Sequence, residues 1–174
     1  PVNKESAGKK PPSYAEYLAS EEKLLQTETM ELHRKFWIDR LTPVPDLPAG
    51  VGESAGEARR ESFVLTPSQA ELLHHTAHEW NLSVNALWFG LCCLHRCKRY
   101  GETEVVTGIP LLGRSGRWER EIIGTFTNTM PMRLPIDRSV GARAFLEQAA
   151  AELNECYRHQ KAPYNQVLQR LQAG

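Results

Sequence analysis

The sequence lacks an excess of either charge. Lysine and arginine together number 21, as do aspartate and glutamate, so the formal net charge is zero. A neutral protein offers no broad basic surface to nucleic acid or to an anionic membrane. The sequence also lacks any apolar run near the roughly 18 residues that span a bilayer, and it does not open with a basic and then apolar signal segment. We therefore expect no nucleic-acid partner and no membrane partner.

Cysteine is scarce, with four in 174 residues. Cys92, Cys93 and Cys97 fall in one expected helix, where neighbours so close cannot pair into a disulfide framework. Their spacing relative to His95 does not match a zinc finger, and small buried thiols explain them better. A reducing, cytoplasmic compartment is the simplest interpretation.

Motifs for phosphate binding and for a serine nucleophile are also missing. The stretch 108–114 lacks the lysine of a P-loop, and no Gly-x-Ser-x-Gly elbow occurs. His74 and His78 stand four apart on an expected helix, which could bring two imidazoles to one metal if a third ligand came from elsewhere. The alternative is a solvated helix face, because Leu73 and Ala77 already define the buried side. We expect no metal site and no directly bound cofactor.

The spacing of apolar residues predicts helices alternating with a few strands, hence an α/β fold with a small mixed sheet packed with helices. Residues 1–12 are polar and form a lead-in or linker. The helix at 83–99 is apolar almost all round, so we expect it to be buried on more than one side. The nearly continuous apolar strand 105–112 is expected to be covered on both faces. The expected helices cover about 14–24, 30–41, 67–80, 83–99, 141–159 and 163–171, and the expected strands cover 61–65, 105–112 and 122–136.

The segment 122–136 is the most informative part of the sequence. Side chains alternate faces along a strand, and here one face is apolar throughout except for Asn128. A carboxamide in an apolar row costs free energy unless it is hydrogen-bonded, so Asn128 is either tied to the backbone or placed for a ligand. Pro131 and Pro135 remove backbone donors, which is typical of an edge strand.

Several separated segments carry a resemblance to a known family. In chain order they are Ser13-Tyr-Ala-Glu-Tyr17, Lys35-Phe-Trp37, Val105-Val-Thr-Gly-Ile-Pro-Leu-Leu-Gly-Arg114, Ile123-Gly-Thr-Phe-Thr-Asn-Thr-Met-Pro-Met-Arg133 and His159-Gln-Lys-Ala-Pro-Tyr164. Their order and spacing resemble the signature segments of condensation domains from nonribosomal peptide synthetases. The resemblance covers residues 13–173.

This resemblance implies a chloramphenicol-acetyltransferase-like lobe over 13–174, the C-terminal one of two lobes with a tunnel between them. The implied reaction forms an amide between substrates carried on the phosphopantetheine arms of carrier-protein domains. The family's His-His-x-x-x-Asp-Gly hallmark, whose second histidine handles the amine proton, does not occur here, and Glu16 stands where the family has aspartate. We therefore expect no catalytic residue in this chain, inactivity of the isolated fragment, and an N-terminal lobe as a necessary partner.

The same resemblance points to particular residues. Asn128 either faces the tunnel and hydrogen-bonds a substrate carbonyl or nearby backbone, or is a purely architectural amide. Arg133 lies on the opposite face, where a structural salt bridge is expected, and His159 at a helix end reads as a C-terminal cap. The tunnel candidates are Asn128, Gly124, Phe126, Thr129 and Met130. The structural candidates are Arg133, Gly108, Pro110, Tyr14, Trp37, His159 and Pro163.

Two other functions stay open on the sequence. One is a non-catalytic platform that docks carrier proteins or tailoring enzymes. The other is a related acyltransferase that makes esters or uses coenzyme A.

Overall fold

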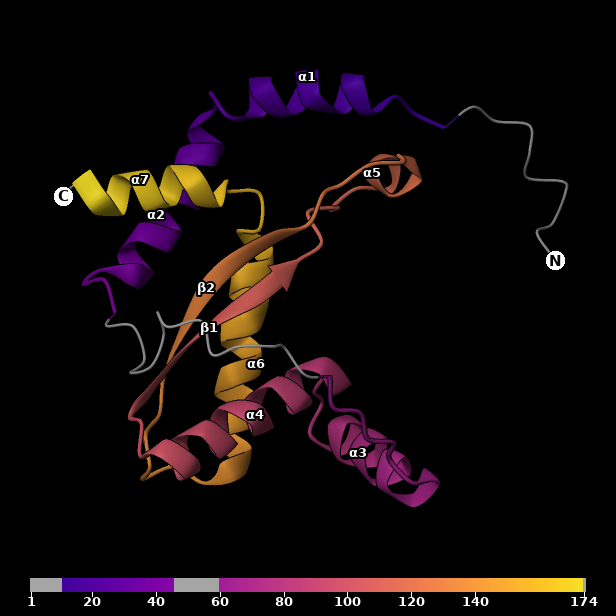
Figure 1. Ribbon diagram of the computed structural model, residues 1–174, viewed down its shortest axis with the longest axis vertical. Helices are drawn as coiled ribbons and strands as arrows, with labels where there is room; N and C mark the ends of the chain where they lie inside the picture. The colour runs from indigo at the N-terminus through magenta and orange to yellow at the C-terminus, as the bar shows by residue number, and fades with distance from the viewer. Residues whose placement is uncertain (1–10, 46–59, 174) are drawn as a thin grey trace, which may run out of the picture. The chain divides into compact units, whose positions relative to one another are not determined.

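The computed structural model describes residues 11–45 and 60–173, so most of the expected lead-in at 1–12 lies outside the described residues. The described chain contains seven helices and two strands (Figure 1). They are α1 (Tyr14–Leu24), α2 (Glu28–Leu41), α3 (Pro67–Glu79), α4 (Val84–Tyr100), β1 (Glu104–Leu111), α5 (Arg117–Glu121), β2 (Asn128–Pro135), α6 (Ala142–Arg158) and α7 (Tyr164–Ala173).

The chain divides into two compact units. The described residues of the first unit are 11–42, 108–131 and 157–173. Those of the second unit are 43–45, 60–107 and 132–156.

The first unit begins with two helices separated by a short break. Ser13 Oγ accepts a hydrogen bond from the Ala15 N–H at 3.2 Å, and Thr27 Oγ1 accepts one from the Met30 N–H at 3.3 Å. Such caps satisfy N–H groups that have no partner inside the helix. The break between the helices expected at about 14–24 and 30–41 is confirmed, and Thr27 is the N-cap of α2.

Helix α7 lies against α2 in the first unit (Figure 1). Arg34 of α2 is buried, and its Nε donates to Gln166 Oε1 of α7 at 2.8 Å while its Nη2 donates to the Leu25 carbonyl at 2.7 Å. Trp37 is fully buried, and its Nε1 donates to the His159 carbonyl at 3.0 Å. Because buried N–H groups cost free energy when unbonded, these bonds fix α7 against α2.

The second unit contains α3, α4 and most of α6. Thr66 and Gln69 form the capping box that the sequence predicts at the start of α3. Helices α4 and α6 approach closely at Gly90, where a Cβ atom would lie 2.5 Å from Leu146 Cδ2. The contact therefore depends on the missing side chain at Gly90.

Only one side of α4 is buried, so the expectation of burial on more than one side is wrong. Leu87 is 2% exposed, whereas Trp88 is 43% and Leu91 39% exposed. Three of the four cysteines are buried and Cys92 is exposed. Burial raises the pKa of the Cys93 thiol to about 11.

Strands β1 and β2 form the two-stranded sheet of the described chain. The Ile136 N–H donates to the Thr103 carbonyl at 2.8 Å, while Gly108 lies beside Thr129. The two strands therefore run in opposite directions. The predicted alternation holds along β2, where Met130, Met132 and Leu134 are fully buried and residues 129, 131, 133 and 135 are not.

Three strand expectations need correction. Strand β2 starts at Asn128 rather than at 122. Residues 61–65 do not form a strand, because no described strand pairs with them, and Val64 is 93% exposed. Strand β1 is covered on one face, with Val105, Ile109 and Leu111 buried, whereas residues 108 and 110 on the other face are exposed.

Within the described residues, every helix is too short or too polar to cross a membrane.

Candidate functional site

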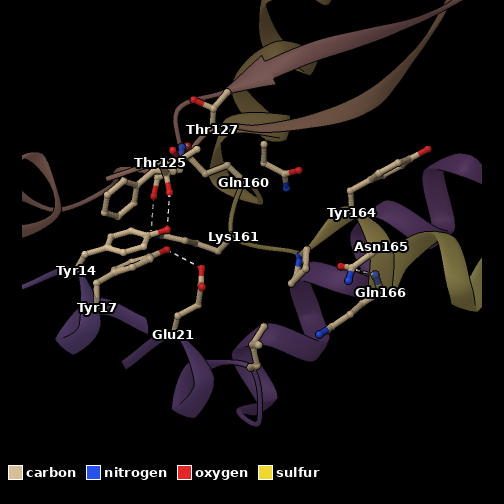
Figure 2. Close-up of a pocket in the computed structure, with 15 residues that line it drawn as sticks. Tyr14, Tyr17, Glu21, Thr125, Thr127, Gln160, Lys161, Tyr164, Asn165 and Gln166 are labelled. Atoms are coloured by element: carbon tan, nitrogen blue, oxygen red, sulfur yellow. Dashed lines mark hydrogen bonds between the residues drawn. The ribbon is translucent and has the colours of Figure 1, made fainter. Parts of the chain in front are cut away.

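A cavity of about 500 Å³ opens in the first unit, and residues from four of the matched segments line it. Figure 2 shows Tyr14 and Tyr17 rising from α1 toward the segment that holds Thr125. Gln160 and Tyr164, from the residues around the start of α7, complete the lining. Segments more than a hundred residues apart in sequence therefore meet at this cavity.

The two tyrosines of α1 are held by hydrogen bonds. Tyr14 donates its hydroxyl proton to the Thr125 carbonyl at 2.8 Å, and Tyr17 donates to Glu21 Oε1 at 2.6 Å (Figure 2). Burial, and then the hydrogen bond to Glu21, raise the pKa of Tyr17 well above its usual value. Tyr17 therefore stays a neutral hydrogen-bond donor at the cavity wall.

Asn128 lines the cavity and also bonds the backbone on both sides. Its Nδ2 donates to the Ala162 carbonyl at 3.0 Å, and its Oδ1 accepts from the Thr129 N–H at 2.9 Å. The amide thus ties the start of β2 to the turn before α7. A carboxamide has two N–H donors and two oxygen lone pairs. The Asn128 nitrogen therefore keeps one N–H, and its oxygen one lone pair, for a ligand.

Phe126 lines the cavity between a cation and an aromatic ring. The Arg114 guanidinium carbon lies 3.9 Å from the centroid of the Phe126 ring, and the Tyr17 ring centroid lies at 4.4 Å. Arg114 also donates to the carbonyls of Ile122 and Gly124, each at 2.9 Å. The sequence analysis did not single out Arg114, although it ends a matched segment.

Lys161 and Glu119 are a second pair that the sequence analysis missed. Lys161 Nζ lies 2.6 Å from Glu119 Oε1 and donates to the Gly113 carbonyl at 2.8 Å. Burial would raise the pKa of Glu119, but hydrogen bonds from Lys161 and from the N–H groups of Gly116 and Ser115 outweigh it and lower the pKa to about 2. Because the two residues are 42 positions apart in the sequence, no local pattern predicts that they form a pair.

The other tunnel candidates lie outside the cavity lining. Gly124 packs under Tyr14, where a Cβ atom would lie 2.4 Å from Cδ2 of the ring. Met130 is fully buried and Thr129 is exposed. Phe126 and Asn128 are therefore the members of the predicted set that line the cavity.

The structural candidates on the two strands lie in different surroundings. Arg133 Nε lies 2.6 Å from Glu104 Oε1, and its Nη1 donates to the Pro43 carbonyl at 2.9 Å. Gly108 and Pro110 are exposed on β1. A Cβ atom at Gly108 would lie 3.2 Å from a methyl group of Thr129.

His159 contacts α2 through its ring. Its Nδ1 lies 2.9 Å from Nδ1 of His33, and its ring stacks on Phe36 with centroids 3.8 Å apart. Burial lowers the pKa of His33. Pro163, four residues on, lines the cavity.

The histidines of α3 are not among the residues that line the cavity. His74, His75 and His78 are exposed, and the described residues contain no group of three or more histidine, cysteine or acidic side chains that could hold a metal.

Comparison with known proteins identifies the family. A family model described as "Condensation domain" matches residues 3–173. The chain belongs to the condensation domain family. Surfactin synthase subunit 1 of Bacillus subtilis (strain 168) is 24% identical over 160 residues, which cover 90% of this chain and 4% of that protein. The resemblance to condensation domains of nonribosomal peptide synthetases is therefore confirmed.

Solved structures share the fold. The first condensation domain of the CDA synthetase has a TM-score of 0.76 at 20% identity, covering 88% of this chain and 35% of that one. SgcC5 from Streptomyces globisporus has a TM-score of 0.81 at 18% identity, covering 97% of this chain and 38% of that one. The expected chloramphenicol-acetyltransferase-like fold is confirmed by these neighbours, and the chain spans a little over a third of their length.

Proposed function

We propose that this chain supplies the C-terminal lobe of a condensation domain that forms an amide bond between two carrier-bound thioesters. The acceptor amine attacks the thioester carbonyl carbon of the donor, a C–N bond forms and the C–S bond breaks. The sulfur leaves as the thiol of the donor's phosphopantetheine arm, and the proton that the amine loses restores the balance. The lobe contributes one wall of the tunnel and part of the surface on which the carrier proteins dock.

One observation carries this proposal. Four segments that match the family signature meet at a single cavity, with Tyr14, Gly113, Asn128 and Tyr164 on its lining. Signature segments that served only packing would have no reason to expose polar groups to the same open space. The cavity volume of about 500 Å³ lies within the range of about 300–1,000 Å³ typical of small-molecule sites.

The residues of this cavity orient a substrate and do not move its proton. Asn128 has one N–H and one oxygen lone pair to offer a thioester carbonyl or an amide. The described residues that line the cavity include no histidine, and an acyl transfer needs a general base within hydrogen-bond reach of the amine. The base comes from the N-terminal lobe, so the isolated fragment is inactive.

Reconstitution tests the proposal. A complete condensation domain that contains residues 1–174 is mixed with a donor and an acceptor carrier protein, each loaded with its aminoacyl group. The expected result is transfer of the donor group to the acceptor amine, read as a mass shift of the acceptor carrier protein, with no transfer by residues 1–174 alone. Carrier binding without transfer in the complete domain would instead indicate a docking platform.

A substitution at Asn128 tests the tunnel wall. In the complete domain, Asn128→Ala is expected to lower kcat/KM by about tenfold or more, as expected when a hydrogen bond to the reacting group is lost. Thr129→Ala is the matched control, because its side chain is exposed outside the cavity and its backbone N–H is kept. If Asn128→Ala reduces thermal stability and leaves condensation unchanged, the amide is architectural.

A further inference from the structure

The stretch between α5 and β2 is held by a side chain rather than by a sheet. Residues 122–127 belong to neither a helix nor a strand. Arg114 donates to the carbonyls of Glu119, Ile122 and Gly124, which lie along this stretch and just before it. A guanidinium presents its five N–H donors in a fixed plane, so bonding to three carbonyls defines the path of the chain there.

The same guanidinium also fixes a side chain of the cavity wall. Its carbon lies 3.9 Å from the centroid of the Phe126 ring, and the rings of Tyr17 and Tyr14 also contact that ring, with centroids 4.4 and 5.7 Å away. A cation over an aromatic face is attracted by the ring's quadrupole, so Arg114 holds both the backbone that leads to Phe126 and the ring itself.

The position of Arg114 is in turn set by its neighbour. Gly113 has φ +67°, and a Cβ atom there would lie 2.2 Å from the Phe126 carbonyl oxygen. Only glycine adopts this conformation and this contact without strain. Gly113 therefore lies close to the Phe126 backbone, and the guanidinium of Arg114 covers the Phe126 ring.

We propose that Arg114 is a positioning residue that fixes Phe126 and thereby sets the size of the acyl or aminoacyl group that the cavity accepts. This inference rests on the proposed function, because it assumes that substrate enters this cavity. Phe126 is the specificity-determining side chain, and Arg114 acts through it. A displacement of such a wall by about an ångström can change rates up to about a hundredfold.

A series of donors of increasing size tests this. The complete domain is assayed with glycyl, alanyl, leucyl and phenylalanyl thioesters on the donor carrier protein, and kcat/KM is measured for each. Phe126→Ala is expected to shift the leucyl-to-alanyl ratio of kcat/KM about tenfold toward the larger group. Arg114→Lys keeps the charge and loses the planar fork, and it is expected to shift the ratio in the same direction.

The two variants are then combined. If Arg114 acts through Phe126, adding Arg114→Lys to Phe126→Ala leaves the ratio where Phe126→Ala alone put it, because residues in contact are not additive. Arg117→Lys is the matched control, since this arginine begins α5, just before the stretch, with a side chain 95% exposed, and it should leave the ratio unchanged.

Four results separate the possibilities. Additive shifts in the double variant, or an Arg114→Lys effect that is equal for all donors, would overturn the role of Arg114 while keeping the cavity as a substrate site. An unchanged ratio in Phe126→Ala would contradict the proposed use of the cavity itself. Hydrogen exchange gives a readout independent of turnover: Arg114→Lys should speed exchange of the amides of 122–126, and unchanged protection there would also overturn the proposal.

Discussion

Lys161 and Glu119 form an ion pair whose side chains are only 16% and 15% exposed, with Nζ and Oε1 2.6 Å apart. The pair joins the residues before α7 to the short helix α5, and so it holds Lys161 in place on the cavity lining. Breaking this pair should lower the free energy of unfolding more than breaking a surface pair does, because removal of one partner leaves a partly desolvated charge.

Replacing Lys161 tests how much the pair contributes to the free energy of unfolding. Lys161→Met is expected to lower the free energy of unfolding by about 2 kcal/mol, since a charge-assisted hydrogen bond is lost and Glu119 stays partly buried. Urea unfolding followed by tryptophan fluorescence measures the change. Lys35→Met, which breaks an exposed pair with Asp39, is the matched control and should change the free energy much less. Equal losses in the two variants would show that the burial of the pair is unimportant.

Acidification should weaken the fold through the same carboxyl. The pKa of Glu119 is lowered from 4.5 to about 2 in the folded chain, so the unfolded chain takes up a proton first as the pH falls. The contribution to stability is therefore present above about pH 4.5 and is lost as the pH falls toward 2. The free energy of unfolding of the wild type should decline over this window, and that of Glu119→Gln should decline less. Parallel curves would exclude Glu119 as the source.

A methyl group at Gly124 should disturb the cavity wall. Its Cβ atom would lie 2.4 Å from Cδ2 of Tyr14, so Gly124→Ala is expected to destabilise the chain by about 1–3 kcal/mol, as overpacking does. Thermal unfolding measures the change. Gly116→Ala is the control, because nothing lies within 4 Å of a Cβ atom there. The penalty should shrink in a Tyr14→Ala background, and an undiminished penalty would point to the backbone instead.

The two faces of α4 should respond differently to truncation. Leu87 is 2% exposed, and Leu87→Ala is expected to cost about 2–5 kcal/mol of stability. The adjacent Trp88 is 43% exposed, and Trp88→Ala should cost clearly less. Chemical denaturation of the two variants compares them. A larger loss at Trp88 would mean that this side of α4 is covered in solution.

The sequence predicts the helices well because their signals are local. Ser13, Thr27 and Thr66 each cap the helix that the spacing places next to them, and the capping box of α3 depends on residues three apart. The alternation along β2 is also local, and it correctly predicts which side chains are buried from Met130 onward.

The errors arise where a distant partner decides the outcome. The segment 61–65 has strand-forming residues but no described strand beside it. The start of β2 shifts to Asn128 because Arg114 bonds the preceding carbonyls. In the candidate site, the sequence indicated Phe126 and Asn128 through the matched segment. Lys161 also lies in a matched segment, but no local pattern indicates that its partner is Glu119, 42 residues away.

The first unit is built from three separate stretches of the sequence, which affects how it folds during synthesis on the ribosome. Trp37 of α2 donates to the carbonyl of His159, which lies 122 residues later. At about 5–20 residues per second, the indole waits roughly 6–24 s before its partner is translated. During that interval the nascent α2 carries an apolar side chain, Trp37, whose partner in this contact has not yet been translated. A chaperone that binds emerging chains would therefore have its longest opportunity at α2, and slowing translation late in the message would lengthen it.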